Sequence, residues 1–382
     1  MGNATSSKVE EALGPGVPLS ERYYGLENFG NTCYCNSVVQ VLFYCLPFRQ
    51  YVLELAERLH DDLQEGEEEE ESRREALGLS AEHSLLPSLC RLFWVLTRQK
   101  QRTGVLAPKE FITRLRQQNM LFRSLMHQDA HEFLIYLLND LSDALRKAGL
   151  FVEQSDGKLV EKGECPPSQG ANKKREEKLT FVQDLFQGYF VNETKCMHCE
   201  CVTTKDEPFL DISVDIEPNV SLTRCLEKFS FTETLSQQNK FYCENCRTLQ
   251  EAQKRMKVKE LPRVLIVHLK RFKYVEQIDT MAKLSCRVVF PHELRLANTS
   301  SGPCGGNDLI YDLAAIVIHV GAGPHQGHYI SVVKSYSHWL VFDDEDVEVV
   351  AELNIQTCYG STSSNPVGGA SCGYLLVYAV RE

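Results

Sequence analysis

Apolar positions in residues 1–150 recur at the spacing of α-helices. Between Asn36 and about His60 they fall three and four residues apart on both sides of Pro47, and a proline inside such a run separates two helices. The same spacing returns in residues 85–96, 108–115 and 130–145. This part of the chain is therefore predicted to form a mainly helical lobe.

The pattern changes in the second half of the chain. Short runs rich in β-branched and aromatic residues alternate with clusters of Gly, Ser, Asn and Pro, which is typical of strands joined by turns. The runs cover residues 264–269, 311–320, 329–333, 339–342 and 374–380. Because most of them follow one another without a helix-length connection, we expect an antiparallel sheet packed on the helical lobe, an α+β fold.

Two segments carry almost no apolar pattern. Residues 61–82 contain an unbroken acidic block, Glu67 to Glu71, which repels itself and is predicted to be a solvated loop. Residues 153–178 are polar and charged, and we expect a mobile loop there.

The N-terminus fits an acylation pattern, with Gly2 exposed after removal of Met1 and a hydroxyl residue at Ser6. A flexible polar tail shows the same pattern by chance, so both alternatives stay open. Lys8 is followed by Glu10 and Glu11, which supply no basic patch. One acyl chain alone gives only weak, reversible membrane attachment, and no more is expected here.

Composition narrows the class of protein and its compartment. The chain has 382 residues, 43% hydrophobic and 24% charged, as in a soluble globular protein of one large domain or two ordinary ones. A net charge of −11 argues against nucleic acid as the principal partner. Without a hydrophobic signal or spanning segment, the 15 cysteines indicate reduced thiols and metal ligands in the cytoplasm or nucleus.

Two Cys-x-x-Cys pairs predict a structural zinc site. They are Cys196 with Cys199 and Cys243 with Cys246, which together supply four thiolates. A redox dithiol is the alternative for one pair, but neither pair opens a clear helix within a βαβ unit. Four thiolates leave no open position for water, so one Zn²⁺ is expected to hold structure. Cys201 is interpreted as a bystander, and His198 is the other local candidate ligand.

Cys33 is the candidate nucleophile. It stands between a loop rich in Gly and Asn and an apolar run from Val38 to Leu46, at the expected first turn of a helix, where backbone N–H groups favour the thiolate. A small buried side chain is the alternative. Asn28, five residues earlier, is placed to direct its amide at the oxyanion that forms when a thiolate adds to a carbonyl.

A base and its orienting carboxylate are predicted near the C-terminal end. His328 enters an apolar strand from a Gly-rich turn, and a following strand ends at Asp343 and Asp344. Adjacent strands would place imidazole and carboxylate side by side, so that the carboxylate fixes the ring tautomer while the ring exchanges a proton with Cys33. His325 is the rival base in the same turn.

His127 and His131 are four residues apart, a spacing that also raises the hypothesis of a metal hydrolase. The zinc-protease motif needs Glu directly after the first histidine, and Gln128 stands there. The alternative is placement of both histidines on a helix surface, with Gln128 and Asp129 capping the helix start.

Taken together, these motifs resemble the ubiquitin-specific proteases, papain-like cysteine proteases that cleave after the C-terminal glycine of ubiquitin. The matching segments are residues 25–40, 128–133, the two Cys-x-x-Cys pairs, 261–272, 327–329 and 339–344. The resemblance implies a catalytic domain at residues 22–382 after a flexible tail at 1–21. It implies a right-hand architecture with a helical thumb (about 25–150), a sheet palm and zinc-bearing fingers (about 185–260).

The resemblance also implies roles for individual residues. Cys33 would be the nucleophile, His328 the base and Asp343 its orienter, and Asp344 is an alternative orienter because alternation along a strand alone does not say which carboxylate faces the ring. Asn28 would stabilise the oxyanion. The family pattern assigns Asp129 to the ubiquitin tail, either its backbone or an arginine.

Within the family the chain is most similar to a compact subfamily that needs WD-repeat scaffold proteins for full activity. The similarity lies in residues 255–259 and 269–274. The chain departs from the family in the insert at 61–82 and in Cys35, which is either a space-filling thiol or one that bridges to the nucleophile under oxidation. A catalytically dead ubiquitin-binding scaffold would not need all four catalytic-site residues together. A hydrolase of another ubiquitin-like modifier would.

Overall fold

The computed structural model describes most of the chain. The described residues are 9–59, 84–124, 126–152, 159–161, 178–276, 279–296, 309–323, 326–362 and 371–381. Gly2, Ser6, His325, the acidic block and nearly all of the segment 153–178 lie outside them, so the expectations about acylation and the two loops stay predictions. Among the described residues, no helix is both long and apolar enough to cross a membrane.

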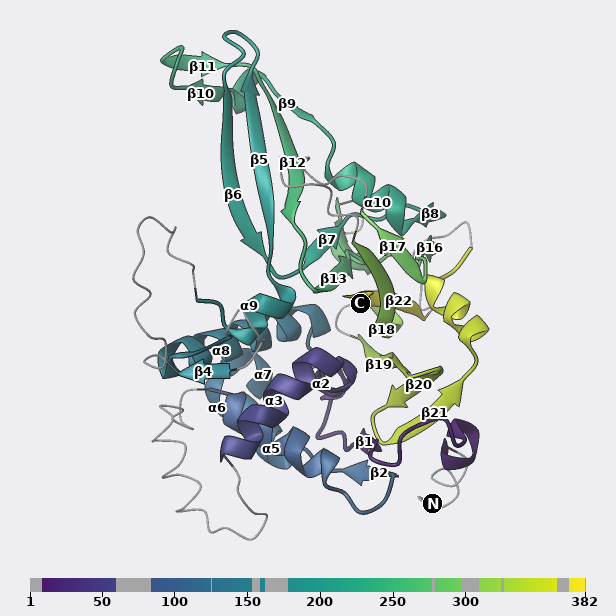
Figure 1. The fold of residues 1–382 in the computed structure, drawn as a ribbon. Helices are drawn as coiled ribbons and strands as arrows, with labels where there is room; N and C mark the ends of the chain where they lie inside the picture. Colours follow the sequence, from purple (N-terminus) through teal and green to yellow (C-terminus); the bar gives the residue numbers. More distant parts are fainter. Residues whose placement is uncertain are drawn as a thin grey trace.

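The helices of the thumb pack around α2, the helix that begins at Cys33. They are α2 (Cys33–Tyr44), α3 (Leu46–Leu59), α5 (Leu86–Thr97), α6 (Lys109–Gln118), α7 (Met120–Arg123), α8 (Ala130–Ala148) and α9 (Phe181–Phe186). Every residue of α2 is buried. This helix contacts α3 and α8 on the thumb side and strands β18, β19 and β20 of the sheet on the other (Figure 1). It is therefore a central element of the contact between thumb and palm.

Local sequence explains where these helices begin and end. α2 ends at Tyr44 and α3 begins at Leu46, with Pro47 in its first turn, so the predicted break is confirmed. α8 begins after Asp129, whose side chain caps the first turn. It ends at Ala148 and is followed by Gly149, whose left-handed φ of 72° glycine adopts without strain.

The palm is one sheet in the order β21-β20-β19-β18-β22-β13-β7, with β17 beside β18. Its strands are β7 (Ile212–Val214), β13 (Val264–Leu269), β17 (Glu293–Arg295), β18 (Ile310–Gly323), β19 (Gln326–Ser335), β20 (His338–Asp343), β21 (Asp346–Val350) and β22 (Cys372–Val380). Each predicted apolar run lies within one of these strands. The sheet is antiparallel as expected except for β7, which pairs with β13 in parallel.

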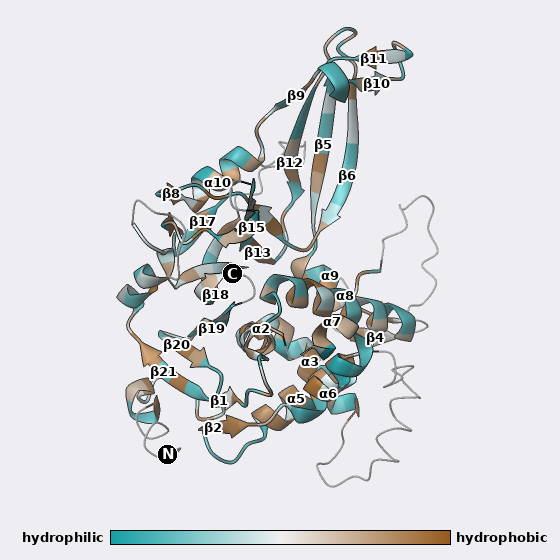
Figure 2. Ribbon diagram, turned by 180° about the vertical axis from the view of Figure 1, so that it is seen from behind, coloured by the Kyte–Doolittle hydropathy of each residue, from teal (hydrophilic) through white to brown (hydrophobic). Residues whose placement is uncertain are grey.

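The fingers project from the palm as a four-stranded sheet in the order β6-β5-β12-β9, with the hairpin β10-β11 at the tip (Figure 1). Their strands are β5 (Gly188–Cys196), β6 (Val202–Phe209), β9 (Glu233–Leu235), β10 (Phe241–Cys243), β11 (Thr248–Gln250) and β12 (Ala252–Glu260). Most of β6 is exposed and polar, and Figure 2 shows the hydrophilic colour along this strand. Apart from residues 189–191 in β5 the strands β5, β6 and β12 are largely polar, so the cysteine pairs were the main mark of this region in the sequence.

Shorter elements connect these parts. They are β1 (Tyr23–Leu26), β2 (Thr103–Leu106), β3 (Leu150–Val152), β4 (Leu159–Glu161), β8 (Val220–Ser221), α10 (Leu222–Phe229), β14 (Phe272–Val275), β15 (Thr280–Lys283), β16 (Val288–Val289) and the 3₁₀ helices η2 (Gln237–Asn239) and η4 (Glu352–Tyr359).

The structure corrects the expectation of a flexible tail that extends to residue 21. Residues 9–13 form a helical turn, and Val9, Leu13 and Val17 are buried in the core. Glu21 accepts two hydrogen bonds from the guanidinium of Arg49 in α3, at 2.8 and 2.9 Å. Val9 and Leu13 lie four residues apart on one face of this turn, and Val17 follows it in a bend; all three pack into the core of the protein.

Candidate active site

Cys33 is the first residue of α2 and is 2% exposed. The loop before it turns through Gly30 and Asn31, both with positive φ (80° and 53°), which lets the chain reverse into the helix. The thiol thus lies at the helix N-terminus, as the sequence predicted. Burial raises the pKa of the neighbouring Cys35 thiol well above its usual value, which favours the space-filling interpretation of that residue.

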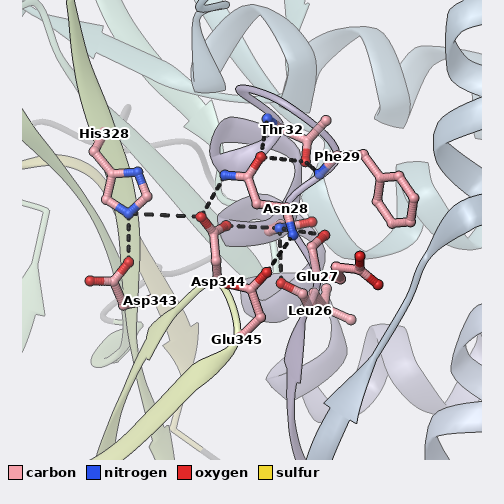
Figure 3. Close-up of polar contacts among 10 residues, drawn as sticks. Leu26, Glu27, Asn28, Phe29, Thr32, His328, Asp343, Asp344 and Glu345 are labelled. Atoms are coloured by element: carbon pink, nitrogen blue, oxygen red, sulfur yellow. Dashed lines mark hydrogen bonds and ion pairs between the residues drawn. The ribbon is translucent and has the colours of Figure 1, made fainter.

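His328 and Asp343 come from neighbouring strands. β19 and β20 pair antiparallel, and His328 Nε2 lies 2.5 Å from Asp343 Oδ1 but 3.9 Å from Asp344 Oδ2 (Figure 3). Asp343 is therefore the direct partner of the imidazole. The structure brings together the histidine and the first of the two carboxylates that the sequence offered.

Asp344 faces a different set of groups. It follows the last residue of β20 and has a left-handed φ of 47°, so its buried side chain turns toward the loop before α2. One carboxylate oxygen accepts a hydrogen bond from Asn28 Nδ2 at 2.6 Å, and the other accepts one from Asn36 Nδ2 at 2.8 Å. Burial raises the pKa of this carboxyl despite these two bonds.

Asn28 is held at three points. Its side-chain oxygen accepts from the backbone N–H of Thr32 at 3.1 Å, its amide nitrogen donates to Asp344, and its backbone N–H donates to Glu345 Oε1 at 2.9 Å (Figure 3). A primary amide carries two N–H donors, so one remains for another acceptor. The side chain is thus oriented as an oxyanion donor must be.

The thiol and the imidazole shift each other's protonation. Burial by itself would raise the pKa of Cys33, but contacts with His127, His328 and the backbone of Tyr329 outweigh it and lower the pKa to about 7. The hydrogen bonds with Asp343 and then Cys33 raise the pKa of His328 to about 10, against its burial. Between these values the pair is a thiolate and an imidazolium, the reactive form of a cysteine nucleophile.

Asp129 is placed as the capping interpretation predicted. Oδ1 accepts from the backbone N–H groups of His131 and Glu132 at 2.7 and 3.2 Å, and Oδ2 accepts from the hydroxyl of Tyr374 at 2.5 Å. A carboxylate has about four acceptor positions, so these bonds leave room for a further donor.

The helix-surface interpretation is wrong for His127, whereas His131 lies on α8 with a side chain that is 20% exposed. His127 precedes α8, is buried and contacts the Cys33 thiol. His131 Nε2 lies 3.0 Å from Asp211 Oδ2, and its ring stacks on His268 with centroids 3.9 Å apart. The loop before α8 turns the first histidine inward, whereas residues four apart on one helix would share a face.

Sequence reasoning also missed Asn36, which lies on α2 and donates to Asp344. Its position three residues after Cys33, on the same helix face, was a signal available in the sequence. Nothing in the sequence indicated that His127 would meet Cys33.

The four cysteines of the two pairs converge at the tip of the fingers. Cys196 ends β5, Cys243 ends β10, and all four sulfur atoms lie within 4.8 Å of one another. Cys199 and Cys243 are 3.5 Å apart, close to the edge of about 3.8 Å expected for thiolates at about 2.3 Å from a tetrahedral zinc. His198 Nδ1 is 3.6 Å from Cys246 Sγ and lies beside this set. The residues fit a structural metal ion.

Comparison with known proteins gives concordant matches over almost the whole chain. A family model described as ubiquitin carboxyl-terminal hydrolase matches residues 24–378. The chain is 49% identical over 381 residues to ubiquitin carboxyl-terminal hydrolase 4 of Arabidopsis thaliana, with 98% of each chain covered. It is 46% identical over 380 residues to ubiquitin carboxyl-terminal hydrolase 12 of Salmo salar, with 99% of this chain and 95% of the relative covered.

Solved structures show the same fold. The SAGA Ubp8/Sgf11/Sus1/Sgf73 deubiquitinating module bound to ubiquitin aldehyde matches with a TM-score of 0.68 at 22% identity, over 97% of this chain and 72% of that chain. A second structure of the yeast module matches with a TM-score of 0.67 at 23% identity, over 96% and 70%. The predicted α+β architecture of thumb, palm and fingers is confirmed.

Proposed function

Because the chain belongs to the ubiquitin carboxyl-terminal hydrolase family and is a cysteine-type deubiquitinase, we propose that Cys33, His328 and Asp343 hydrolyse the bond after the C-terminal glycine of ubiquitin. The observation that carries this assignment is the arrangement around His328. One ring nitrogen bonds Asp343 at 2.5 Å, and the ring also contacts the thiol at the start of α2.

The reaction follows from these contacts. The Cys33 thiolate attacks the glycine carbonyl carbon, and the C=O electrons move onto oxygen. As this intermediate collapses, the C–N bond breaks and the His328 imidazolium gives its proton to the leaving amine, so ubiquitin is left as a thioester. His328 then takes a proton from water, which attacks the thioester and releases ubiquitin and the Cys33 thiolate. Asp343 holds the ring tautomer throughout.

Asn28 is proposed to donate its remaining amide N–H to the oxyanion, and Asp344 to act as the positioning residue that fixes this amide. The support is the 2.6 Å bond from Asn28 to Asp344 and the burial of the carboxylate. A donor that is already oriented costs no reorganisation when negative charge develops on the substrate.

The two adjacent carboxylates are expected to give different kinetic results when each is changed to asparagine. Asp343→Asn removes the charge beside the imidazole, so kcat should fall by about 10³–10⁴-fold and alkylation of Cys33 by iodoacetamide should slow. Asp344→Asn should lower kcat by about 10²-fold and leave alkylation unchanged, because this carboxylate bonds the oxyanion donor Asn28 and the helix residue Asn36 and not the imidazole. Steady-state cleavage of a ubiquitin–fluorophore substrate and timed alkylation measure both effects. If alkylation slowed in Asp344→Asn and not in Asp343→Asn, Asp344 would be the carboxylate that orients His328.

Asp129 is proposed to bind the ubiquitin tail through the acceptor positions that the helix cap and Tyr374 leave free.

The fingers are proposed to hold one Zn²⁺ through Cys196, Cys199, Cys243 and Cys246. When bound, the metal would supply a structural cross-link, since four thiolates leave it no open position.

The test of the function as a whole uses ubiquitin that carries an electrophile at its C-terminus. We expect rapid covalent labelling, with the adduct mapped to the peptide that contains Cys33. Probes built on other ubiquitin-like modifiers should react at least about tenfold more slowly. Faster labelling by one of those probes would make the protein a hydrolase of that modifier.

A WD-repeat scaffold is the proposed activator. The support is the resemblance in residues 255–259 and 269–274, together with exposed apolar side chains on the fingers, among them Tyr242 and Leu249. A partner that binds the aligned site more tightly than the misaligned one raises activity by shifting that population.

The expected signature of this activation is a low basal kcat that rises on addition of the scaffold, with a smaller change in KM. The ubiquitin–fluorophore assay measures both constants with and without the scaffold. Tyr242→Ser with Leu249→Ser should abolish the rise and preserve basal activity. Full activity of the free enzyme, with no response to a scaffold, would exclude this regulation.

A further inference from the structure

His127 is a buried imidazole that the reaction above does not use. It lies in the short segment between α7 and α8 and is 9% exposed. Neither ring nitrogen has a hydrogen-bond partner of standard geometry within the residues that the structure describes. A buried polar ring without such a partner is costly, so the group that it does face is informative.

Two rings fix the position of this imidazole. It lies parallel to the ring of Tyr329, with centroids 5.1 Å apart and planes 1° apart, and it meets His319 edge-on at 5.8 Å. Tyr329 directly follows His328 on β19, so the strand that carries the proposed base also carries the platform for His127. The ring is therefore held between the loop before α8 and strands β18 and β19, and it contacts the Cys33 thiol there.

The titratable groups around His127 come from three elements. They are Cys33 on α2, His319 on β18, and His328 with Tyr329 on β19. Burial, and then the charge of Lys283, lower the pKa of His319 to about 3, so this ring is neutral. Asp129, two residues along the chain, directs its carboxylate to the α8 cap and to Tyr374. The Cys33 sulfur is then the anionic acceptor that the His127 ring faces.

We propose that His127 is a second imidazole partner of the Cys33 sulfur, donating a ring N–H to the thiolate so that the nucleophile stays ionised and aimed between thumb and palm. This inference rests on the proposed role of Cys33. His127 transfers no proton in the reaction, since of the two imidazoles at Cys33 only His328 is partnered by a carboxylate. It is a positioning residue that stabilises one state of the thiol.

The effect is measurable without ubiquitin. A hydrogen bond to a charged group, lost on substitution, should raise the pKa of the thiol by about one unit. The thiolate fraction at pH 7 would then fall from about one half to about one tenth, which slows alkylation about fivefold at pH 7 and little at pH 9. A merely structural role would not shift the pH at which alkylation begins.

The experiment is alkylation of Cys33 by iodoacetamide from pH 5 to 10, followed by mass spectrometry of the peptide that contains Cys33. Wild type should show an apparent pKa of about 7. His127→Phe keeps the stack on Tyr329 but has no N–H, and should shift the profile upward by about one unit. His127→Gln, which retains an amide donor, should shift it by less than half as much. His131→Gln, a histidine four residues on that contacts Asp211, should match wild type.

Three results would overturn the proposal. The first is a pH profile of His127→Phe that superimposes on that of wild type. The second is an equal shift of the alkylation pKa in His127→Phe and His127→Gln. The third is a similar shift of that pKa in His131→Gln. Thermal melting checks that each variant is folded, and His127→Leu replaces the Phe variant if that one is not. Failure here is distinct from failure of the proposed function, because ubiquitin-probe labelling of wild type at Cys33 would be unaffected.

Discussion

Replacement of Cys33 by alanine is expected to lower kcat/KM for ubiquitin release by at least about 10⁴-fold. The methyl group cannot add to the glycine carbonyl, so neither the tetrahedral intermediate nor the thioester forms, and what remains is binding and oxyanion stabilisation. The affinity for ubiquitin should be unchanged, because one buried sulfur at the start of α2 contributes little to that interface. Fluorogenic ubiquitin cleavage and a titration with unmodified ubiquitin measure the two quantities.

Cys35→Ala is the matched control for this result. Cys35 lies on the same helix two residues on and is equally buried, but burial raises its pKa and keeps it a thiol. Its loss removes a small core side chain, so stability should fall modestly while activity remains within a few-fold of wild type. Substantial turnover in Cys33→Ala, or its loss only in Cys35→Ala, would end the assignment of Cys33 as the nucleophile.

Cys243→Ser is expected to release the metal and to unfold the tip of the fingers. Wild type should contain about one zinc per chain, and the variant none, because three thiolates and a hydroxyl bind Zn²⁺ far more weakly. The hairpin β10-β11 has only three residues in each strand, largely exposed, and a hairpin of this kind is marginal in water without a cross-link. Cross-strand ion pairs such as Lys257 with Glu193 at 2.9 Å are partly exposed and contribute little.

Metal analysis by mass spectrometry and amide hydrogen exchange across residues 188–260 test this expectation. Protection should fall in the fingers and persist in α2, whose core is separate from the zinc cluster. Cys201→Ser, at an exposed thiol outside the cluster, should keep the metal, and so should His198→Ala if the four cysteines complete the site. A wild-type protein that is folded and active without metal would refute the zinc proposal.

Local sequence determined much of this protein. The spacing of apolar residues placed the thumb helices and the palm strands, because burial of one face imposes its period on the chain. Thiol spacing marked the fingers, although β5, β6 and β12 are largely polar. Cys33 at a helix start and His328 at a strand start were evident, because turn residues and capping chemistry act over a few positions.

Contacts between distant segments were decided only by the tertiary structure. The order of Asp343 and Asp344 could not be read from alternation, because β20 ends at the first and the left-handed backbone of the second breaks the period. The sequence did not show that Val9 would be buried, because it packs into a core that elements distant in the chain form. His127 faces Cys33 because the loop before α8 turns inward and Tyr329 stacks on its ring, and no local pattern encodes the meeting of α2, α8 and β19.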